Sequence, residues 1–155
     1  MHFETQEDID RPIADVFAAV TDFDSFERAA IRRGVDVQRI GDATTPLDAQ
    51  AWDAGFQFRG SARKMQIKIQ SLNAPDAITY GAAGNGMVGD MALTLQEIAP
   101  NRTRMMVQLT LKPKTLAARL LVQSLKLARN KLNRKFRQKV SEFARNAEAQ
   151  PVQSA

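Results

Sequence analysis

Apolar residues change their spacing twice along the chain, and each change predicts a different kind of element. Residues 2–10 mix apolar and acidic side chains in a short stretch typical of one strand. After Pro12 the apolar residues recur three, four and seven positions apart, which is the spacing of an amphipathic helix. We therefore expect two short helices within residues 12–33, the second capped by Asp24 and ended at Gly34.

Beyond these helices the apolar period shortens to two. Apolar and polar residues alternate in successive segments, and Gly, Asn and Pro mark the turns between them. No helical spacing intervenes, so the pattern favours an antiparallel meander with one apolar face and one solvated face. The strands are expected at residues 35–40, 52–59, 65–70, 78–82, 91–96 and 105–111.

The last predicted element is a single long helix. Residues 115–147 contain neither Pro nor Gly, and we expect Thr115 to be the N-cap. At about 1.5 Å per residue such a helix would approach ~50 Å. Its apolar residues fall within a sector of about 100°, which is enough to cover the apolar face of the sheet. They are Leu125, Leu132, Phe136, Val140 and Phe143.

Composition limits the chemistry that is available. With 155 residues, 44% of them hydrophobic, we expect one globular domain over residues 1–149 and a disordered tail at 150–155. Cysteine is absent and His2 is the one histidine. These counts argue against a disulfide framework, a thiolate nucleophile, a Ser-His-Asp triad and a multi-histidine metal site. We expect no metal and no cofactor.

The N-terminus is acidic, without the apolar core of a secretory signal, and no run of residues is apolar enough to span a membrane. We therefore expect a cytoplasmic protein.

Charge is distributed unevenly along the chain. Residues 1–100 carry nine Lys and Arg against fifteen Asp and Glu, whereas residues 101–155 carry thirteen against two. The cations of the long helix either form a solvated face or contact RNA, the ribosome or an anionic membrane. The basic surface is assigned to Lys126, Lys131, Arg134, Lys135 and Arg137.

Several motifs follow one another in an order that belongs to a known architecture. They are Ile9 to Val20 (IDRPIADVFAAV) with Asp22, Phe23 and Phe26; Gly41-Asp42; Trp52 with Phe56 and Arg59-Gly60; and Leu120-Leu121 with Leu125 to Leu127. Over residues 2–147 the chain resembles the START/SRPBCC superfamily, which includes birch-pollen-allergen-like proteins, polyketide cyclases and coenzyme-Q-binding proteins. The resemblance implies an α+β helix-grip fold. In that fold a curved antiparallel sheet of six to seven strands grips one long C-terminal helix, and two short helices accompany it.

The resemblance also implies a cavity between the sheet and the C-terminal helix. We expect it to bind a hydrophobic small molecule such as a lipid, quinone or polyketide, although the same apolar residues would equally form a filled core. Arg129 would either meet a polar head group or extend to solvent. The candidate lining residues are Trp52, Phe56, Phe58, Met65, Ile67, Tyr80, Met91, Leu93, Leu109, Leu125, Arg129 and Leu132.

Two further functions stay open at this point. One is an enzyme of the cyclase or dehydratase type, for which Tyr80 is the candidate acid-base group, because Asp53 and Asp90 are expected to face solvent or a turn. No pair of titratable residues has a suggestive spacing, so no catalytic residue is assigned. The other is an interaction module that uses the basic helix on RNA, the ribosome or an anionic membrane surface. The oligomeric state is left open.

Overall fold

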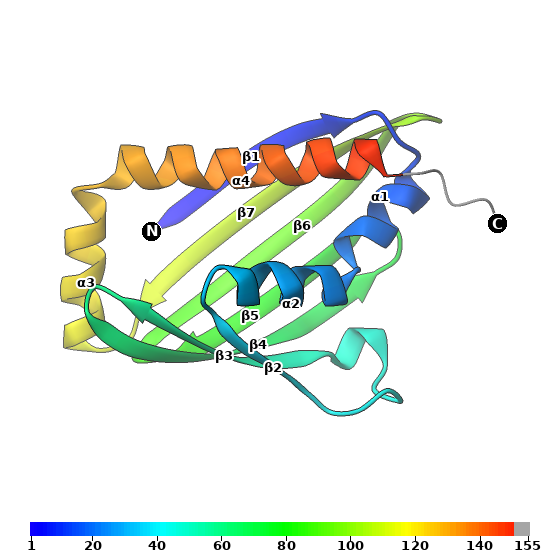
Figure 1. The fold of residues 1–155 in the computed structure, drawn as a ribbon. Coiled ribbons are helices and arrows are strands. Elements are labelled where there is room, and N and C mark those ends of the chain that lie inside the picture. The colour runs from blue at the N-terminus through cyan, green and yellow to red at the C-terminus, as the bar shows by residue number, and fades with distance from the viewer. Residues whose placement is uncertain (151–155) are drawn as a thin grey trace.

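The computed structural model describes residues 1–150 and contains one seven-stranded antiparallel sheet with four α-helices (Figure 1). Of the predicted tail at 150–155, only Gln150 lies within the described residues. The strands are β1 (His2–Ile9), β2 (Asp36–Ile40), β3 (Ala51–Phe58), β4 (Ser61–Asn73), β5 (Ala77–Gly84), β6 (Met87–Ala99) and β7 (Arg102–Pro113). The helices are α1 (Ile13–Val20), α2 (Phe23–Arg32), α3 (Leu116–Lys126) and α4 (Arg129–Ala149), with a 3₁₀ turn at Leu47–Ala49.

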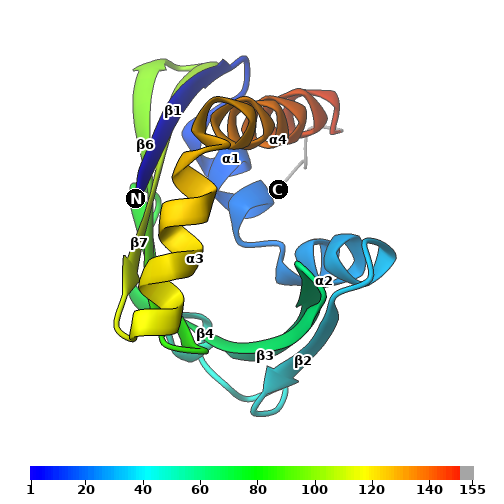
Figure 2. The same ribbon diagram turned by 90° about the vertical axis from the view of Figure 1, so that its left-hand side faces the viewer.

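The sheet order is β1-β7-β6-β5-β4-β3-β2, so the first two strands of the chain form its two edges. Helices α1 and α2 carry the chain from one edge to the other, and consecutive pairing from β2 to β7 forms the predicted meander. Register shifts interrupt the β4–β5 and β6–β7 ladders, and such bulges increase bending and twist. Figure 2 shows the curved sheet, with α4 across one end and α2 near the other. The predicted helix-grip fold class is confirmed.

The two short helices form where they are expected, but the second has a different cap. The Asp22 carboxylate, not that of Asp24, accepts a hydrogen bond from the backbone N–H of Ser25 at 3.3 Å. Gly34 follows the helix with φ of +87°, a conformation that favours glycine. The N–H groups of Gly34 and Val35 donate to carbonyls of the last turn, which ends the helix as predicted.

The predicted continuous helix over residues 115–147 is instead two helices. Thr115 caps α3 as expected, through a 3.1 Å hydrogen bond from the N–H of Ala118, but the chain bends at Leu127 and Ala128. Residue spacing gives no signal for this bend, because there is neither Pro nor Gly. Tertiary contacts explain it: α3 packs against β7 and α4 against β1. In addition, the Arg59 guanidinium donates to the Ser124 hydroxyl at 2.9 Å, which ties the end of α3 to the β3–β4 turn.

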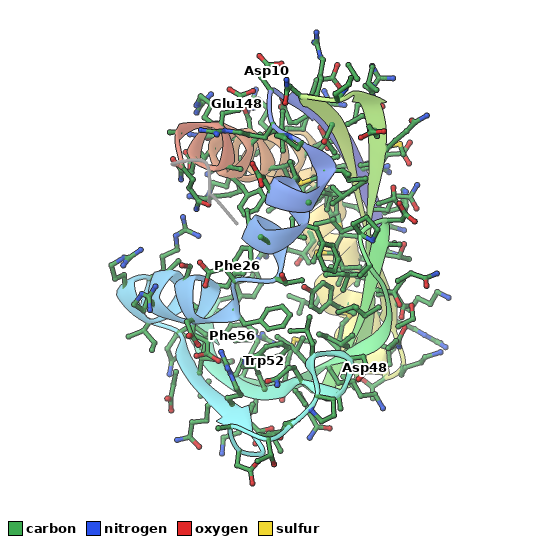
Figure 3. All side chains as sticks on the ribbon, turned by 90° about the vertical axis from the view of Figure 1, so that its right-hand side faces the viewer. Asp10, Phe26, Asp48, Trp52, Phe56 and Glu148 are labelled. Atoms are coloured by element: carbon green, nitrogen blue, oxygen red, sulfur yellow. The ribbon has the colours of Figure 1, made fainter. Side chains whose placement is uncertain are left out.

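Contacts at the edges of the sheet hold α4 and α2. Ala144 and Ala147 are buried, and these small side chains let α4 approach β1 closely. At the far end of α4, the Arg11 guanidinium donates to the Glu148 carbonyl, at 2.9 Å from Nε and 2.6 Å from Nη2. The N–H of Asp10 donates to the Glu148 carboxylate at 2.8 Å, and Figure 3 shows both residues at one end of the molecule. Helix α2 packs against β2 at the opposite edge.

Substitution of the two aspartates tests whether Asp22, and not Asp24, caps α2. Replacing a capping Asp by Ala leaves a helix N–H without its partner and costs about 1 kcal/mol. Asp22→Ala should therefore lower the free energy of unfolding by about 1 kcal/mol in urea denaturation. Asp24→Ala is the matched control and should cost about half as much or less, since it loses only a solvent-exposed pair with Arg39. Equal losses, or a larger loss for Asp24→Ala, would contradict this assignment.

Candidate functional site

A cavity of about 580 Å³ lies between the concave face of the sheet and helices α2 and α4. This volume is within the range of small-molecule binding sites. Its walls are mostly apolar, and every strand from β2 to β7 contributes to them. The lining residues are Val20, Phe23, Phe26, Glu27, Ala30, Val37, Trp52, Ala54, Met65, Ile67, Tyr80, Gly81, Ala82, Gly89, Asp90, Met91, Leu93, Met105, Val107, Leu109, Leu111, Phe136, Lys139, Val140 and Phe143.

Small residues in the middle of the sheet help to keep this space open. The strand register places Ile67 opposite Ala82, Ala82 opposite Gly89, and Gly89 opposite Leu111. A Cβ atom at Gly89 would lie 3.3 Å from the Leu111 Cδ2 atom, so even a methyl group there would crowd the wall. The inner face of the two central strands therefore carries little side-chain volume at these positions.

The structure brings seven of the twelve predicted lining residues together at this cavity. They come from β3 to β7 and alternate along their strands as the period of two requires. Their role as ligand contacts stays a prediction. The seven are Trp52, Met65, Ile67, Tyr80, Met91, Leu93 and Leu109.

The other five predicted lining residues lie outside the cavity. Phe56 and Phe58 follow Trp52 toward the β3–β4 turn, where guanidinium groups 5.7 and 5.6 Å from the Phe58 ring centre partly cover it. Leu125 is buried in α3, which contributes nothing to the lining, while Arg129 is exposed and Leu132 half-buried in the first turn of α4. These last three errors come from treating residues 115–147 as one straight helix.

Sequence reasoning missed the contribution of α2. Phe23, Phe26 and Ala30 line the cavity, and their spacing of three and seven residues was a readable signal of an inward helix face. The Phe23 ring meets the Trp52 ring edge-on at 5.1 Å, and Phe26 stacks on Phe143 of α4 at 5.5 Å. Figure 3 labels Phe26 on α2, with Trp52 close by on β3. Helix α2 thus closes the side of the cavity opposite β7.

One ordered carboxylate stands at the α2 wall. The Glu27 Oε1 atom accepts a hydrogen bond from the Trp52 indole N–H at 2.7 Å and another from the Arg39 guanidinium at 2.6 Å. The pKa of Arg39 is raised, mainly by its hydrogen bond to Glu27. Lys139 of α4 also lines the cavity and is exposed, as is Phe26 with 44% of its surface accessible. The cavity therefore reaches the surface between α2 and α4, where an acid and a base line it.

Tyr80 is the titratable side chain most affected by the interior. It lines the cavity on β5, and burial raises its pKa from 10.0 to about 12. At neutral pH its hydroxyl is protonated and can donate a hydrogen bond. The structure places Asp90 in the lining as well, although it was expected at a turn; it pairs with Gly81 within the β5–β6 ladder.

The five basic-surface residues Lys126, Lys131, Arg134, Lys135 and Arg137 are all exposed, and their role as contacts stays a prediction. Within residues 1–150, no three His, Cys, Asp or Glu side chains gather in a group that could hold a metal ion. Among the helices of the same range, none combines the length and apolarity that crossing a bilayer requires.

Known structures with this arrangement are similar in fold and distant in sequence. An aromatase/cyclase, ZhuI, from Streptomyces sp. R1128 has a TM-score of 0.66 at 13% identity, over 96% of this chain and 93% of its own. A START superfamily protein from Mycobacterium smegmatis has a TM-score of 0.57 at 10% identity, over 86% and 95%. The protein Ara h 8.0201 has a TM-score of 0.58 at 15% identity, over 96% and 95%.

No family model and no curated protein matches the sequence. At such low identities the solved structures establish architecture alone. The motif order, the seven-stranded curved sheet and these structural matches agree: the chain has a START-like helix-grip fold.

Proposed function

We propose that this protein binds a hydrophobic small molecule, of lipid, quinone or polyketide type, in the cavity between the sheet and α4. One observation carries the proposal: a volume of about 580 Å³ with almost entirely apolar walls. The proposal also includes a single domain over residues 1–149 and a cytoplasmic location. The shared fold with a START superfamily protein and an aromatase/cyclase supports it.

Burial of the ligand's own apolar surface supplies the driving force. Each square ångström removed from water contributes about 25 cal/mol, so about 300 Å² would contribute about 7.5 kcal/mol. Part of this is offset by the ligand's lost freedom of motion. The methionines at positions 65, 91 and 105 line the cavity, and their unbranched side chains adapt to ligands of different shape.

The polar lining groups would determine the orientation of the ligand in the cavity. Glu27 and Lys139 stand on α2 and α4, near the exposed Phe26. A polar or hydrogen-bonding end of the ligand would lie there, and its apolar part would extend toward Met91 and Leu109. Glu27 is suited to this role because Trp52 and Arg39 both donate to its Oε1 atom, which fixes the carboxylate and leaves Oε2 as an acceptor.

Filling the cavity tests the proposal. Ala82→Phe places a ring on the inner face at the centre of the cavity. The affinity of this variant for an environment-sensitive apolar dye should be about tenfold lower than that of the parent, or lower still, because the ring occupies space that the dye needs. The measurement is a fluorescence titration with the purified protein.

Ala92→Phe is the matched control, since Ala92 lies on the neighbouring strand β6 but not in the lining. It should bind the dye as the parent does. Absence of saturable dye binding by the parent, or equal losses in the two variants, would count against the proposal. Thermal melting of both variants confirms that they are folded.

An enzyme of the cyclase or dehydratase type is the second candidate, and Tyr80 favours it. Tyr80 lines the cavity, and partial burial raises the pKa of its hydroxyl to about 12. In this protonated form it would donate to a ligand carbonyl, which polarises that group. A poly-β-ketone thioester followed by absorbance of an aromatic product tests this candidate. Tyr80→Phe should then slow product formation about 100-fold or more while dye binding persists; no product from the parent would exclude this reaction.

The raised pKa of Tyr80 has its own test, because the chain contains one Tyr. In the native protein the tyrosinate absorbance should appear with a midpoint near pH 12, and in urea near 10.0. The unfolded chain releases this proton first as the pH rises. This residue's contribution should therefore lower the free energy of unfolding from pH 10.0 up to about pH 12. A native midpoint equal to that in urea would contradict the burial of Tyr80.

A further inference from the structure

Helix α3 exposes large apolar side chains where a solvated helix would carry polar ones. Leu116 has 73% of its surface accessible and Leu120 has 63%. Leu127, at the bend between α3 and α4, has 91%. These are the three highest exposures among the large hydrophobic residues that the structure describes. Isolated exposed leucines are ordinary, but two on one helix and a third at its C-cap require a reason.

Leu116 and Leu120 share one face of α3, and the C-cap residue Leu127, with φ of −66° and ψ of −26°, continues the helical path. At about 100° per residue they fall within about 40° of one another. The buried residues Ala118 and Val122 lie on roughly the opposite side, so the helix already has its sheet-facing surface. Helix α3 thus has two apolar faces, one packed on the protein and one exposed to solvent. Packing within the fold explains why the first face is apolar, but it does not explain the second.

Cations surround this leucine face. Between Glu97 and Glu142 the sequence has twelve Lys and Arg and not one Asp or Glu. Six of these cations lie on α3 or within a few residues of its ends, and all six are exposed. Within residues 1–150 none of the six forms an ion pair. They are Lys112, Lys114, Arg119, Lys126, Arg129 and Lys131.

The combination of exposed leucines and unpaired cations identifies the partner by its chemistry. RNA would satisfy the cations, but it would leave three leucines beside a phosphate backbone without aromatic side chains to stack on its bases. A second copy of this surface would bring like charges together. An anionic bilayer satisfies both parts, since leucines enter the acyl boundary and cations meet lipid phosphates.

We propose that α3 and the bend after it dock this protein on an anionic lipid bilayer, through Leu116, Leu120 and Leu127 with the six neighbouring cations. This surface differs from the basic face predicted on the sequence, because the apolar contribution comes from α3 and its bend. Figure 2 shows α3 in front of the sheet, with α4 leaving from its upper end. Docking through this surface does not depend on an occupied cavity.

Co-sedimentation of the full chain with lipid vesicles tests the proposal. The probe is phosphatidylcholine vesicles with about one third phosphatidylserine, compared with vesicles of phosphatidylcholine alone. The parent should bind the anionic vesicles more tightly, and added salt should weaken binding. The triple variant Leu116→Gln, Leu120→Gln, Leu127→Gln should bind about tenfold more weakly or worse, because it loses the inserted apolar surface.

Two controls separate the causes of any loss. Leu47→Gln changes a leucine that is 41% exposed in the 3₁₀ turn, away from α3, and should leave vesicle binding unchanged. Lys126→Gln with Arg129→Gln and Lys131→Gln should weaken binding and reduce its salt dependence. Dye binding in the cavity should survive in every variant, which shows that they are folded and keeps this test separate from that of the proposed function.

Four results would overturn the proposal. They are failure of the parent to bind anionic vesicles at low salt, equal binding to neutral vesicles, and unchanged binding of the leucine variant. The fourth is a concentration-dependent dimer that the leucine variant abolishes, because the face would then join two copies of the chain. Binding to single-stranded RNA without binding to vesicles is one form of the first result and would assign the cations to nucleic acid.

Discussion

The site depends on where the helices are attached to the sheet. Helix α4 packs against β1 and α2 against β2, and these are the two edge strands. At the β1 edge, Arg11 and the N–H of Asp10 hold the end of α4 through Glu148. Because the sheet curves between these edges, the helices span its centre instead of lying on it, as Figures 1 and 2 show. The helices thereby cover the apolar inner face of the sheet and leave a cavity between themselves and that face.

The residues at the centre preserve the space that this attachment creates. Ala82 and Gly89 face each other across β5 and β6, where larger side chains would occupy the cavity. Across the gap, the stacked rings of Phe26 and Phe143 connect α2 with α4. An apolar interior with a polar group at its edge favours ligands that have a small polar end and a large apolar body. The exposed leucines of α3 and of the bend after it belong to a different surface. Their proposed role is docking on an anionic bilayer, which is separate from ligand binding.

Sequence periodicity predicted the elements that depend on local pattern. The alternation along β3 to β7 identified Trp52, Met65 and Met91 as inward residues. The glycine that follows the helical spacing identified Gly34 as the end of α2. It did not predict properties that depend on distant contacts. The bend at Leu127 follows from the different strands against which α3 and α4 pack, so the helical wheel misplaced Arg129.

Position along a strand is also invisible to periodicity. Phe56 and Phe58 follow Trp52 with the correct spacing, yet they lie beyond the end of the cavity, near the β3–β4 turn. A wheel that assumes one straight helix places Leu127 outside the apolar sector, but it does not predict that this exposed residue lies at a bend. Cavity volume itself depends on how far the edge contacts hold α4 from the sheet centre, which no single residue encodes.

The central claim is that an open apolar cavity lies between the sheet and helices α2 and α4. Crystals of the protein under xenon pressure test it most directly, because xenon enters dry apolar cavities and scatters strongly. The claim predicts a xenon site inside the fold, among Trp52, Met91 and Phe136, which line the cavity. An interior in which these side chains meet and no xenon binds would contradict it.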